Sequence, residues 1–254
     1  MISERTFARY FPGFWGELLP LLTPAFVHVI KESYERHVLG DFGFPADAVG
    51  KQSESGNSAV LAEFAYFLAK AAVENKCEVA ETFQSEELRT SALQCAEAAV
   101  EKYEARGGSI PATVTLGDQQ EALALGRNYE LFFRQRSFDT ENIELSVQIP
   151  GAGFLSPCQA DLSIGSRVFE IKTVDRNIAG KDIRQLIVYL ALQAGTGERR
   201  WNRAGFFNPR RAVYQEFDVD QVISRMSGGR SSAEVFRDLI DFVCSRDVQI
   251  DIAF

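Results

Sequence analysis

The sequence predicts a mixed α/β fold (of the α+β type) with a helical N-terminal region. Apolar residues in the first half recur at the three- and four-residue spacing of amphipathic helices. After Pro111 the pattern changes to short segments rich in β-branched and aromatic residues, which are typical of strands. Their order, helix–strand–strand–strand–helix–strand, predicts a mixed β-sheet flanked by helices.

Three helical regions are predicted in the first half of the chain. The first spans 14–38 and is interrupted by two prolines, which disrupt a helix interior. The second begins at Ser58, a candidate N-cap, after a loop at 41–58 that is rich in Gly, Ser and Pro. The third begins at Ser85 as N-cap and ends at Gly107–Gly108, because glycine favours a helix C-terminus.

The second half is predicted to contain five strands around a central helix at 181–195. Another helix at 116–136 precedes the first strand, and the chain ends in two helices that Gly228–Gly229 separates. The predicted strands are 143–151, 159–165, 167–174, 204–208 and 212–219. The sequence thus predicts two domains, a helical one over 1–108 and an α/β one over 109–254.

The net charge of −8 is confined to the first half of the chain. Residues 1–125 hold 10 Lys/Arg against 18 Asp/Glu, whereas residues 126–254 hold 17 of each. Between 171 and 211 the balance is basic, with nine Lys/Arg and three Asp/Glu. Because phosphate binding depends on the local field more than on the total charge, this acidic chain is compatible with a nucleic-acid site.

Composition favours a cytoplasmic protein. No apolar run approaches the roughly 20 residues of a membrane span, and the N-terminus lacks the apolar core of a signal peptide. The cysteines form no CxxC pair, which argues against a zinc site and against a disulfide framework. We expect reduced and mostly buried thiols at Cys77, Cys95, Cys158 and Cys244.

Asp161, Glu170 and Lys172 form the strongest candidate for a catalytic site. Side chains alternate between the faces of a strand, so Glu170 and Lys172 share one side while Ile171 points into apolar packing on the other. A tight turn at Gly165–Ser166 brings Asp161 beside this pair. Two carboxylates and a lysine among apolar residues are costly unless they are paired or bind a metal. Together they suit Mg²⁺ held by oxygen ligands, with the lysine orienting the attacking water.

A simpler interpretation of the same residues is a structural ion pair. A Glu–Lys or Asp–Lys pair in a half-exposed strand is common, and an isolated ExK pattern would favour it. The motifs before and after these residues in the sequence favour a catalytic site over a structural ion pair. The sequence offers no competing centre, because it contains neither a Gly-rich phosphate loop nor a GxSxG nucleophile motif.

With these motifs the sequence resembles the PD-(D/E)XK nuclease superfamily over about residues 120–220. In that family a helix that often carries a glutamate precedes a strand with an aspartate, and the next strand carries (D/E)xK. The RecB-like branch adds QxxxY on the helix that follows. The matching residues are Glu130, Asp161, Glu170, Lys172, Gln185 and Tyr189. No proline directly precedes the aspartate, a departure that the family tolerates. The resemblance implies a restriction-endonuclease-like sheet flanked by helices.

The resemblance also implies roles for Asp161, Glu170 and Lys172 on the strands and for Glu130 on the helix before them. Asp161 and Glu170 would be ligands of Mg²⁺ or Mn²⁺, together with the main-chain carbonyl of Ile171. Lys172 would hold the attacking water and stabilise the charge that develops on the phosphate. Glu130 would be an outer metal ligand or would orient a metal-bound water.

On the following helix, Gln185 would brace the site or touch the substrate backbone. Tyr189 either acts directly or is a core residue with a satisfied hydroxyl, which is the commoner case for a tyrosine in an apolar helix. Some related nucleases hold an iron–sulfur cluster with three clustered downstream cysteines. Here only Cys244 follows the motif, so a cluster is not expected.

Basic residues around the motif are candidate nucleic-acid contacts. Arginine suits phosphate because its planar group donates two hydrogen bonds and stays charged. The alternative is that these residues neutralise the acidic half in an interdomain contact. The predicted contacts are Lys181, Arg184, Arg199, Arg200, Arg203 and Arg210, with Arg211 beside them.

These patterns predict a Mg²⁺- or Mn²⁺-dependent nuclease acting on DNA more than on RNA. The alternative is a non-catalytic scaffold that binds nucleic acid or protein on the same fold. A third reading is a nuclease subunit that is active only in a larger complex, with a protein partner on the acidic N-terminal half. DNA processing or anti-phage defence in bacteria is what the family resemblance implies.

Overall fold

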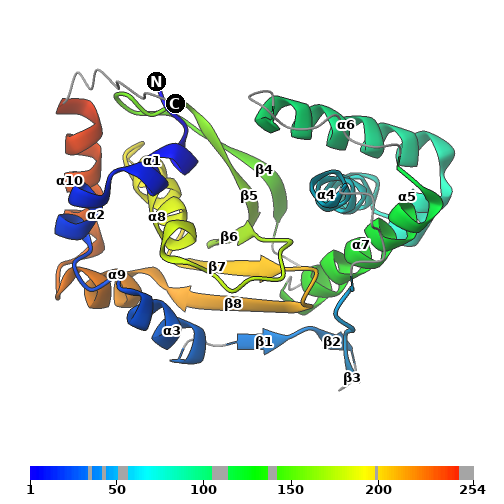
Figure 1. Ribbon diagram of the computed structural model, residues 1–254, viewed down its shortest axis with the longest axis horizontal. Helices are drawn as coiled ribbons and strands as arrows, with labels where there is room; N and C mark the ends of the chain where they lie inside the picture. The colour runs from blue at the N-terminus through cyan, green and yellow to red at the C-terminus, as the bar shows by residue number, and fades with distance from the viewer. Residues whose placement is uncertain are drawn as a thin grey trace.

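The computed structural model describes residues 1–33, 36–41, 44–50, 57–104, 114–136, 142–197 and 200–245. A mixed sheet lies at the centre of the molecule, between two groups of helices (Figure 1). This architecture confirms the predicted mixed α/β fold with its helical N-terminal region. No helix in the described part of the chain combines the length and apolar character that crossing a bilayer requires.

Five of the six strands in this sheet are those predicted in the second half. Neighbouring strands run antiparallel, except for one parallel pair formed by β6 and β7. In sheet order the strands are β1 (Arg36–Val38), β8 (Val213–Asp218), β7 (Arg203–Asn208), β6 (Arg167–Ile171), β5 (Cys158–Ile164) and β4 (Ile143–Ile149). The parallel pair requires a crossover connection, which α8 (Gly180–Ala194) provides.

The C-terminal end of the segment predicted as helix at 14–38 is a strand and not a helix. α3 ends at Ser33, and the next described residues form β1 at the free edge of β8. An edge strand offers unpaired N–H and C=O groups, which the backbone of β1 satisfies. Downstream, β2 (Gly40–Asp41) and β3 (Phe44–Pro45) form a small antiparallel pair within the predicted loop.

The first of two hydrophobic cores lies between α8 and one face of the sheet. Phe7 and Trp15 from the N-terminal helices are buried in it beside Leu239 near the C-terminal end. The helices around α8 are α1 (Glu4–Tyr10), α2 (Pro12–Leu18), α3 (Pro24–Ser33), α9 (Val219–Ser227) and α10 (Ser232–Ser245). α1 packs directly on α8, as Figure 1 shows.

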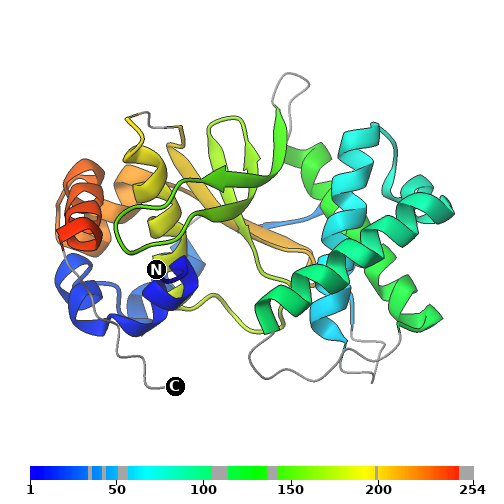
Figure 2. The same cartoon turned by 90° about the horizontal axis from the view of Figure 1, so that it is seen from above.

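The second core lies on the opposite face of the sheet. Successive residues such as Phe206 and Phe207 alternate between the first and the second core, as strand geometry dictates. The second core is covered by α4 (Ser58–Asn75), α5 (Val79–Gln84), α6 (Glu86–Glu104) and α7 (Leu116–Arg136). These helices gather at one end of the molecule, away from α10 (Figure 2).

The two cores do not follow the predicted domain boundary at residue 108. Residues 1–33 belong to the first core with the second half of the chain, whereas α4–α7 pack on the other face of the same sheet. An aromatic cluster explains the placement of the N-terminus, because the Phe7 ring contacts both Phe154 and Phe242. The N-terminal segment is thus part of the fold around the sheet and not of a separate helical domain.

Helix termini and cysteines refine the sequence predictions. The α4 N-cap is Asn57, one residue before the predicted Ser58, whereas Ser85 accepts a hydrogen bond from the Leu88 amide as an N-cap does. Gly107–Gly108 lies outside the described residues. All four cysteines are free, but the expectation that most are buried is wrong. Cys158 is buried, and burial raises the pKa of its thiol to about 12, whereas Cys95 and Cys244 are exposed.

At the position of Asp161, the inward-pointing side chains of β4 and β5 switch from the first core to the second. Val147 and Ala160, paired across the two strands, lie in the first core, whereas the pair Leu145 and Leu162 lies in the second. Between them Ser146 adopts a left-handed backbone with φ of 59°, which rotates β4 locally. Asp161 therefore sits at a twist in the sheet, where its side chain can turn toward the neighbouring strand β6.

Candidate active site

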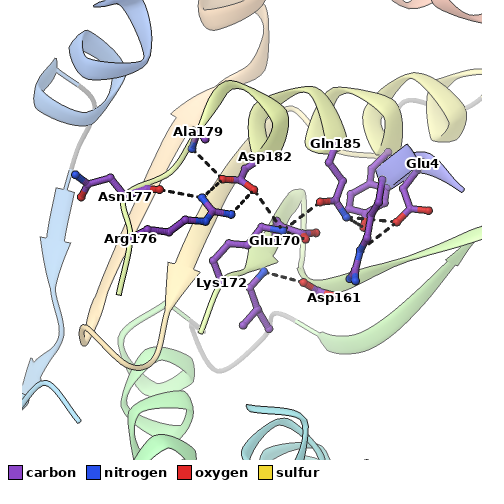
Figure 3. A network of polar contacts seen from close by, with 12 residues as sticks. Glu4, Asp161, Glu170, Lys172, Arg176, Asn177, Ala179, Asp182 and Gln185 are labelled. Atoms are coloured by element: carbon purple, nitrogen blue, oxygen red, sulfur yellow. Dashed lines mark hydrogen bonds and ion pairs between the residues drawn. The ribbon is translucent and has the colours of Figure 1, made fainter. Parts of the chain in front are cut away.

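Asp161, Glu170 and Lys172 meet on adjacent strands, as Figure 3 shows. Asp161 in β5 accepts a hydrogen bond through Oδ2 from the main-chain nitrogen of Ile171, at 2.8 Å. Lys172, directly after β6, donates through Nζ to Oε1 of Glu170, at 2.7 Å. The Ile171 side chain packs against the second core, so it points away from Glu170 as the strand alternation predicts.

One oxygen of Glu170 has no partner. The Glu170 side chain is fully buried, and its Oε2 atom makes no hydrogen bond within the described structure. A buried acceptor without a partner costs about 1–3 kcal/mol, and more when it carries charge. This oxygen marks a position where a cation or a donor would be stabilised.

The charge of Glu170 also acts on Asp161. Burial raises the pKa of Asp161 well above its ordinary value, and repulsion from Glu170 raises it further. The hydrogen bond from Ile171 and the charges of Arg5 and Lys172 oppose this rise without cancelling it. Without a cation, the Asp161 carboxyl therefore retains its proton to a higher pH than an ordinary aspartate does.

Lys172 is held in place by several acceptors. Besides Glu170, its Nζ atom donates to Oε1 of Gln185 at 3.1 Å and lies 3.7 Å from Oδ1 of Asp182. Arg176 binds both carboxylate oxygens of Asp182, at 2.6 and 3.0 Å. Burial would raise the pKa of Asp182, but the bonds from Arg176 and the Ala179 amide lower it, so this carboxylate remains charged beside Lys172.

Gln185 and Tyr189 occupy one face of α8, as their four-residue spacing predicts. Gln185 is 4% exposed, and its Nε2 donates to the Tyr189 hydroxyl at 2.8 Å and to Oε1 of Glu4 at 3.4 Å. The Tyr189 side chain is fully buried and belongs to the first core. In this arrangement Gln185 fixes Lys172, and Tyr189 fixes Gln185 from within the core.

The oxygen atoms of the site suit a hard divalent cation. Mg²⁺ and Mn²⁺ favour carboxylate, carbonyl and water oxygens, and Mg²⁺ keeps several waters when proteins bind it. Across the described residues, no group of three or more His, Cys, Asp or Glu side chains is arranged to hold a metal. A cation here would therefore depend on Asp161, Glu170, a main-chain carbonyl and water. The unpartnered Oε2 of Glu170 and the raised pKa of Asp161 are both consistent with such a cation.

The structure does not bring Glu130 to these residues. Its Oε1 atom lies 2.5 Å from Nη2 of Arg134, and the same nitrogen lies 3.2 Å from Glu78 at the start of α5. Gly126, one turn earlier on α7, faces Val79 of α5, so this side of the helix is turned toward α5. Helix geometry gives the reason, because residues four apart share a face.

Four residues near the carboxylates were missed by the sequence analysis. Glu4 and Arg5 come from α1, and Glu63 and Tyr66 come from α4. Burial raises the pKa of Glu63, and the charge of Arg5 lowers it, which places these two side chains in one electrostatic environment. The only sequence signal for α1 is Ser3, whose hydroxyl caps the helix by accepting from the Thr6 amide.

Tyr66 connects the helical group to the twist of the sheet. Its hydroxyl donates to the main-chain oxygen of Asp161 at 3.0 Å and lies 2.8 Å from Oγ of Ser146. Tyr66 thereby holds the two strands where they change sides. Because the backbone position of Asp161 depends on this contact, α4 contributes to the geometry of the site.

Most of the predicted nucleic-acid contacts are engaged within the protein. Arg210 is 2% exposed and forms a buried ion pair with Glu121 of α7, at 2.6 Å. Arg203 pairs with the buried carboxylate of Glu216, and Arg200 pairs with Glu144. The assignment of Arg210 to nucleic-acid binding is wrong, because a buried guanidinium cannot reach a ligand. Its partner Glu121 lies in α7, within the predicted 109–254 domain, so the pair is not the interdomain contact of the alternative either.

The remaining predicted contacts differ in their surroundings. Arg184 donates to the main-chain oxygen of Ala8 at 2.6 Å and so joins α8 to α1. Lys181 is exposed at the first turn of α8, and Arg211 donates to the side-chain oxygen of Asn177. Arg199 lies outside the described residues. Among the described members of the predicted set, Lys181 is thus exposed, and Arg200 and Arg203 keep 35% and 34% of their side chains exposed beside their ion pairs.

A hollow opens beside Lys172. Its walls are largely apolar, with Phe206 and Tyr214 among them, and Arg176 and Arg211 stand at its polar rim. The hollow lies along the ends of β6 and β7, next to the lysine. Its guanidinium groups suit a small anionic group.

Comparison of the sequence with protein-family models and with curated proteins finds no match to either. The assignment of the site therefore depends on its own geometry, which joins the buried carboxylate of Glu170, the part-buried carboxylate of Asp161, a fixed lysine and a bracing glutamine.

Proposed function

We propose that this chain is a metal-dependent nuclease that hydrolyses phosphodiester bonds, with DNA as its preferred substrate. The observation that carries the proposal is the buried Oε2 of Glu170, which makes no hydrogen bond within the described structure, between an Asp161 with a raised pKa and the fixed ammonium of Lys172. The Glu170–Lys172 ion pair alone does not satisfy the second oxygen of Glu170 and does not account for the raised pKa of Asp161.

In this proposal Asp161 and Glu170 hold Mg²⁺ or Mn²⁺, aided by the carbonyl of Ile171. When bound, the cation supplies Lewis-acid polarisation of the phosphate and a more acidic water. These oxygens suit it because charge repulsion within the pair falls when a cation lies between the two carboxylates.

Lys172 positions the attacking water. An ammonium group donates three hydrogen bonds, and Glu170 and Gln185 accept two of them. The contact with Asp182, at 3.7 Å, is too long for a hydrogen bond, so the third N–H is available to a water or a phosphate oxygen. In that place Lys172 would stabilise the charge that develops on the phosphate in the transition state.

The hollow beside Lys172 is the proposed place for a phosphate next to the scissile bond. Arg211 and Arg176 are among the residues that line it and would contact that phosphate. Lys181 supplies a further exposed positive charge on α8.

The proposal also includes a partner surface on the helices of the second core. α6 begins with Glu86 and Glu87 and carries further acids along its length, so it presents negative charge away from the site. Such a surface repels nucleic acid and suits a basic protein partner. A role as the nuclease subunit of a cytoplasmic DNA-processing or defence assembly would use both surfaces.

Cleavage assays test the proposal directly. The purified chain is incubated with plasmid, linear duplex DNA, single-stranded DNA and RNA, each with Mg²⁺, Mn²⁺ or EDTA. We expect cleavage that EDTA abolishes and that Asp161→Asn and Glu170→Gln remove while both variants stay folded. Binding without cleavage by wild type and both variants alike would instead support the non-catalytic scaffold. Cleavage that persists in either variant would exclude these residues as metal ligands.

A further inference from the structure

Helix α1 is anchored firmly next to the candidate site. Ile2 exchanges main-chain hydrogen bonds with Phe154 and Ser156, both at 2.9 Å. Phe7 is fully buried in the aromatic cluster, and Arg184 of α8 donates to the carbonyl of Ala8. The start of the chain is therefore a fixed part of the fold, and its side chains have defined positions relative to α8.

Glu4 links α1 to the site through a chain of polar contacts. Its side chain is 11% exposed, and its Oε1 atom lies 3.4 Å from Nε2 of Gln185 and 3.6 Å from Nε of Arg5. Gln185 in turn accepts from Lys172, which donates to Glu170. Figure 3 shows Glu4 and Lys172 on either side of Gln185. An unbroken series of contacts thus connects Arg5 with the buried carboxylate.

Arg5 differs from the other residues of this series in its exposure. Its side chain is 51% exposed, whereas those of Glu4 and Lys172 are 11% and 16% exposed. Partial burial lowers the pKa of Arg5, but the negative charges of Glu170 and Asp161 raise it by more. The Arg5 guanidinium therefore interacts electrostatically with both candidate metal ligands, and about half of its side chain is exposed to solvent.

We infer that Arg5 is a substrate-phosphate contact of the proposed nuclease site, joined to that site through Glu4 and Gln185. This inference rests on the proposed function. Arg5 is attracted by the same negative charges of Asp161 and Glu170 that would bind a cation. Its positive charge would repel that cation, so Arg5 weakens metal binding in the protein without substrate. A guanidinium binds phosphate through paired N–H groups, and its half-exposed position leaves it accessible to a substrate.

Arg5→Gln and Arg5→Lys test the inference, with Arg9→Gln as the matched control on the same helix. Arg9 is exposed and lies over the Tyr10 ring, so it carries the same charge without the link through Glu4. Mn²⁺ binding is measured by titration calorimetry of the metal-free chain. Binding of fluorescent single-stranded and duplex DNA is measured in EDTA over a range of salt concentrations.

We expect Arg5→Gln to bind Mn²⁺ on the order of five-fold more tightly, because one nearby positive charge is removed. The same variant should bind DNA at least about ten-fold more weakly, as expected for one lost charge-assisted contact. The slope of log K against log[salt] should fall by about 0.7–0.9. Arg5→Lys should retain the slope but bind DNA less tightly than wild type, since it lacks the paired donors. Arg9→Gln should match wild type in Mn²⁺ binding.

Wild-type affinities for Mn²⁺ and DNA in Arg5→Gln would overturn the inference, as would equal losses in Arg9→Gln. Weaker Mn²⁺ binding in Arg5→Gln would also overturn it, because Arg5 would then support the ligands. If wild type cleaves DNA and Arg5→Gln cleaves equally well, only this inference fails. If wild type neither binds nor cleaves nucleic acid, the proposed function fails and the inference falls with it.

Discussion

The Tyr66 hydroxyl lies 3.0 Å from the main-chain oxygen of Asp161, which joins a helix of the second core to the strand that carries the candidate metal ligand. The two residues are 95 positions apart in the sequence. The contact falls where β4 and β5 turn from one core to the other, so it holds the backbone that determines the direction of the Asp161 side chain.

Tyr66→Phe should therefore weaken both the fold and the site. The part-buried carbonyl of Asp161 loses a donor, which costs about 1–3 kcal/mol in the free energy of unfolding. We also expect weaker Mn²⁺ binding, because Asp161 is less well positioned. Urea unfolding and titration calorimetry measure the two effects. Tyr10→Phe, at an exposed position, is the control, and equal behaviour of the two variants would refute a role for the Tyr66 hydroxyl.

Asp161→Asn should change how stability depends on pH in the absence of metal. The pKa of Asp161 is about 3.9 in an unfolded chain and well above that in the fold, so the folded state retains the proton to higher pH. Wild-type stability should thus fall as the pH rises from about 4 toward the folded pKa. Asn keeps an oxygen for the Ile171 amide but has no charge, so the variant should be the more stable one at neutral pH. Denaturant unfolding in EDTA at several pH values measures the difference, and a gap that stays constant with pH would rule out this origin.

Lys172→Met should lower the cleavage rate by at least about 10²-fold, the scale for one lost electrostatic donor in a transition state. Mn²⁺ binding should remain closer to wild type, since the two carboxylates are retained. Single-turnover rates and calorimetric affinities separate the two effects. A parallel loss of metal affinity and rate would instead indicate that Lys172 mainly maintains the ligands.

The parts of the site that the sequence predicts are those that local geometry determines. Strand alternation places Glu170 and Lys172 together, and helix spacing places Gln185 and Tyr189 on one face. Glu4 and Arg5 could not be predicted in the same way, because 181 positions separate Glu4 from Gln185 and only the folded chain joins them.

The arginines assigned to nucleic-acid binding could not be judged from the sequence either, because their partners are also distant in the chain. A basic stretch in the sequence does not reveal which carboxylates lie opposite it in the fold. Glu121 lies 89 positions before Arg210, and the buried carboxylate of Glu216 pairs with Arg136, Arg167 and Arg203. A buried ion pair such as that of Arg210 withdraws the arginine from a substrate. The twist at Ser146 was equally hidden, because a serine at positive φ has no distinctive sequence pattern.

Arg210→Gln should destabilise the fold without affecting DNA contacts. Removing one partner leaves Glu121 charged and buried, which costs about 3–5 kcal/mol for a pair of this kind. Urea unfolding measures the loss. The salt dependence of DNA binding should stay as in wild type at a temperature where both proteins are folded. A flatter slope would restore Arg210 as a phosphate contact.

Phe7→Ala tests whether the N-terminal segment belongs to the fold around the sheet. Phe7 is fully buried, and its ring lies 5.2 Å from that of Trp15, 5.7 Å from that of Phe154 and 6.1 Å from that of Phe242. Truncating such a ring costs about 3–5 kcal/mol, so α1 should lose its anchor and the whole chain should unfold at lower denaturant. Tyr10→Phe keeps the exposed end of α1 intact and is the control. If α1 were part of a separate helical domain, the variant would unfold in two steps, with the tryptophan signal of Trp15 lost before that of Trp201. We expect one cooperative transition, because both tryptophans lie in the same core.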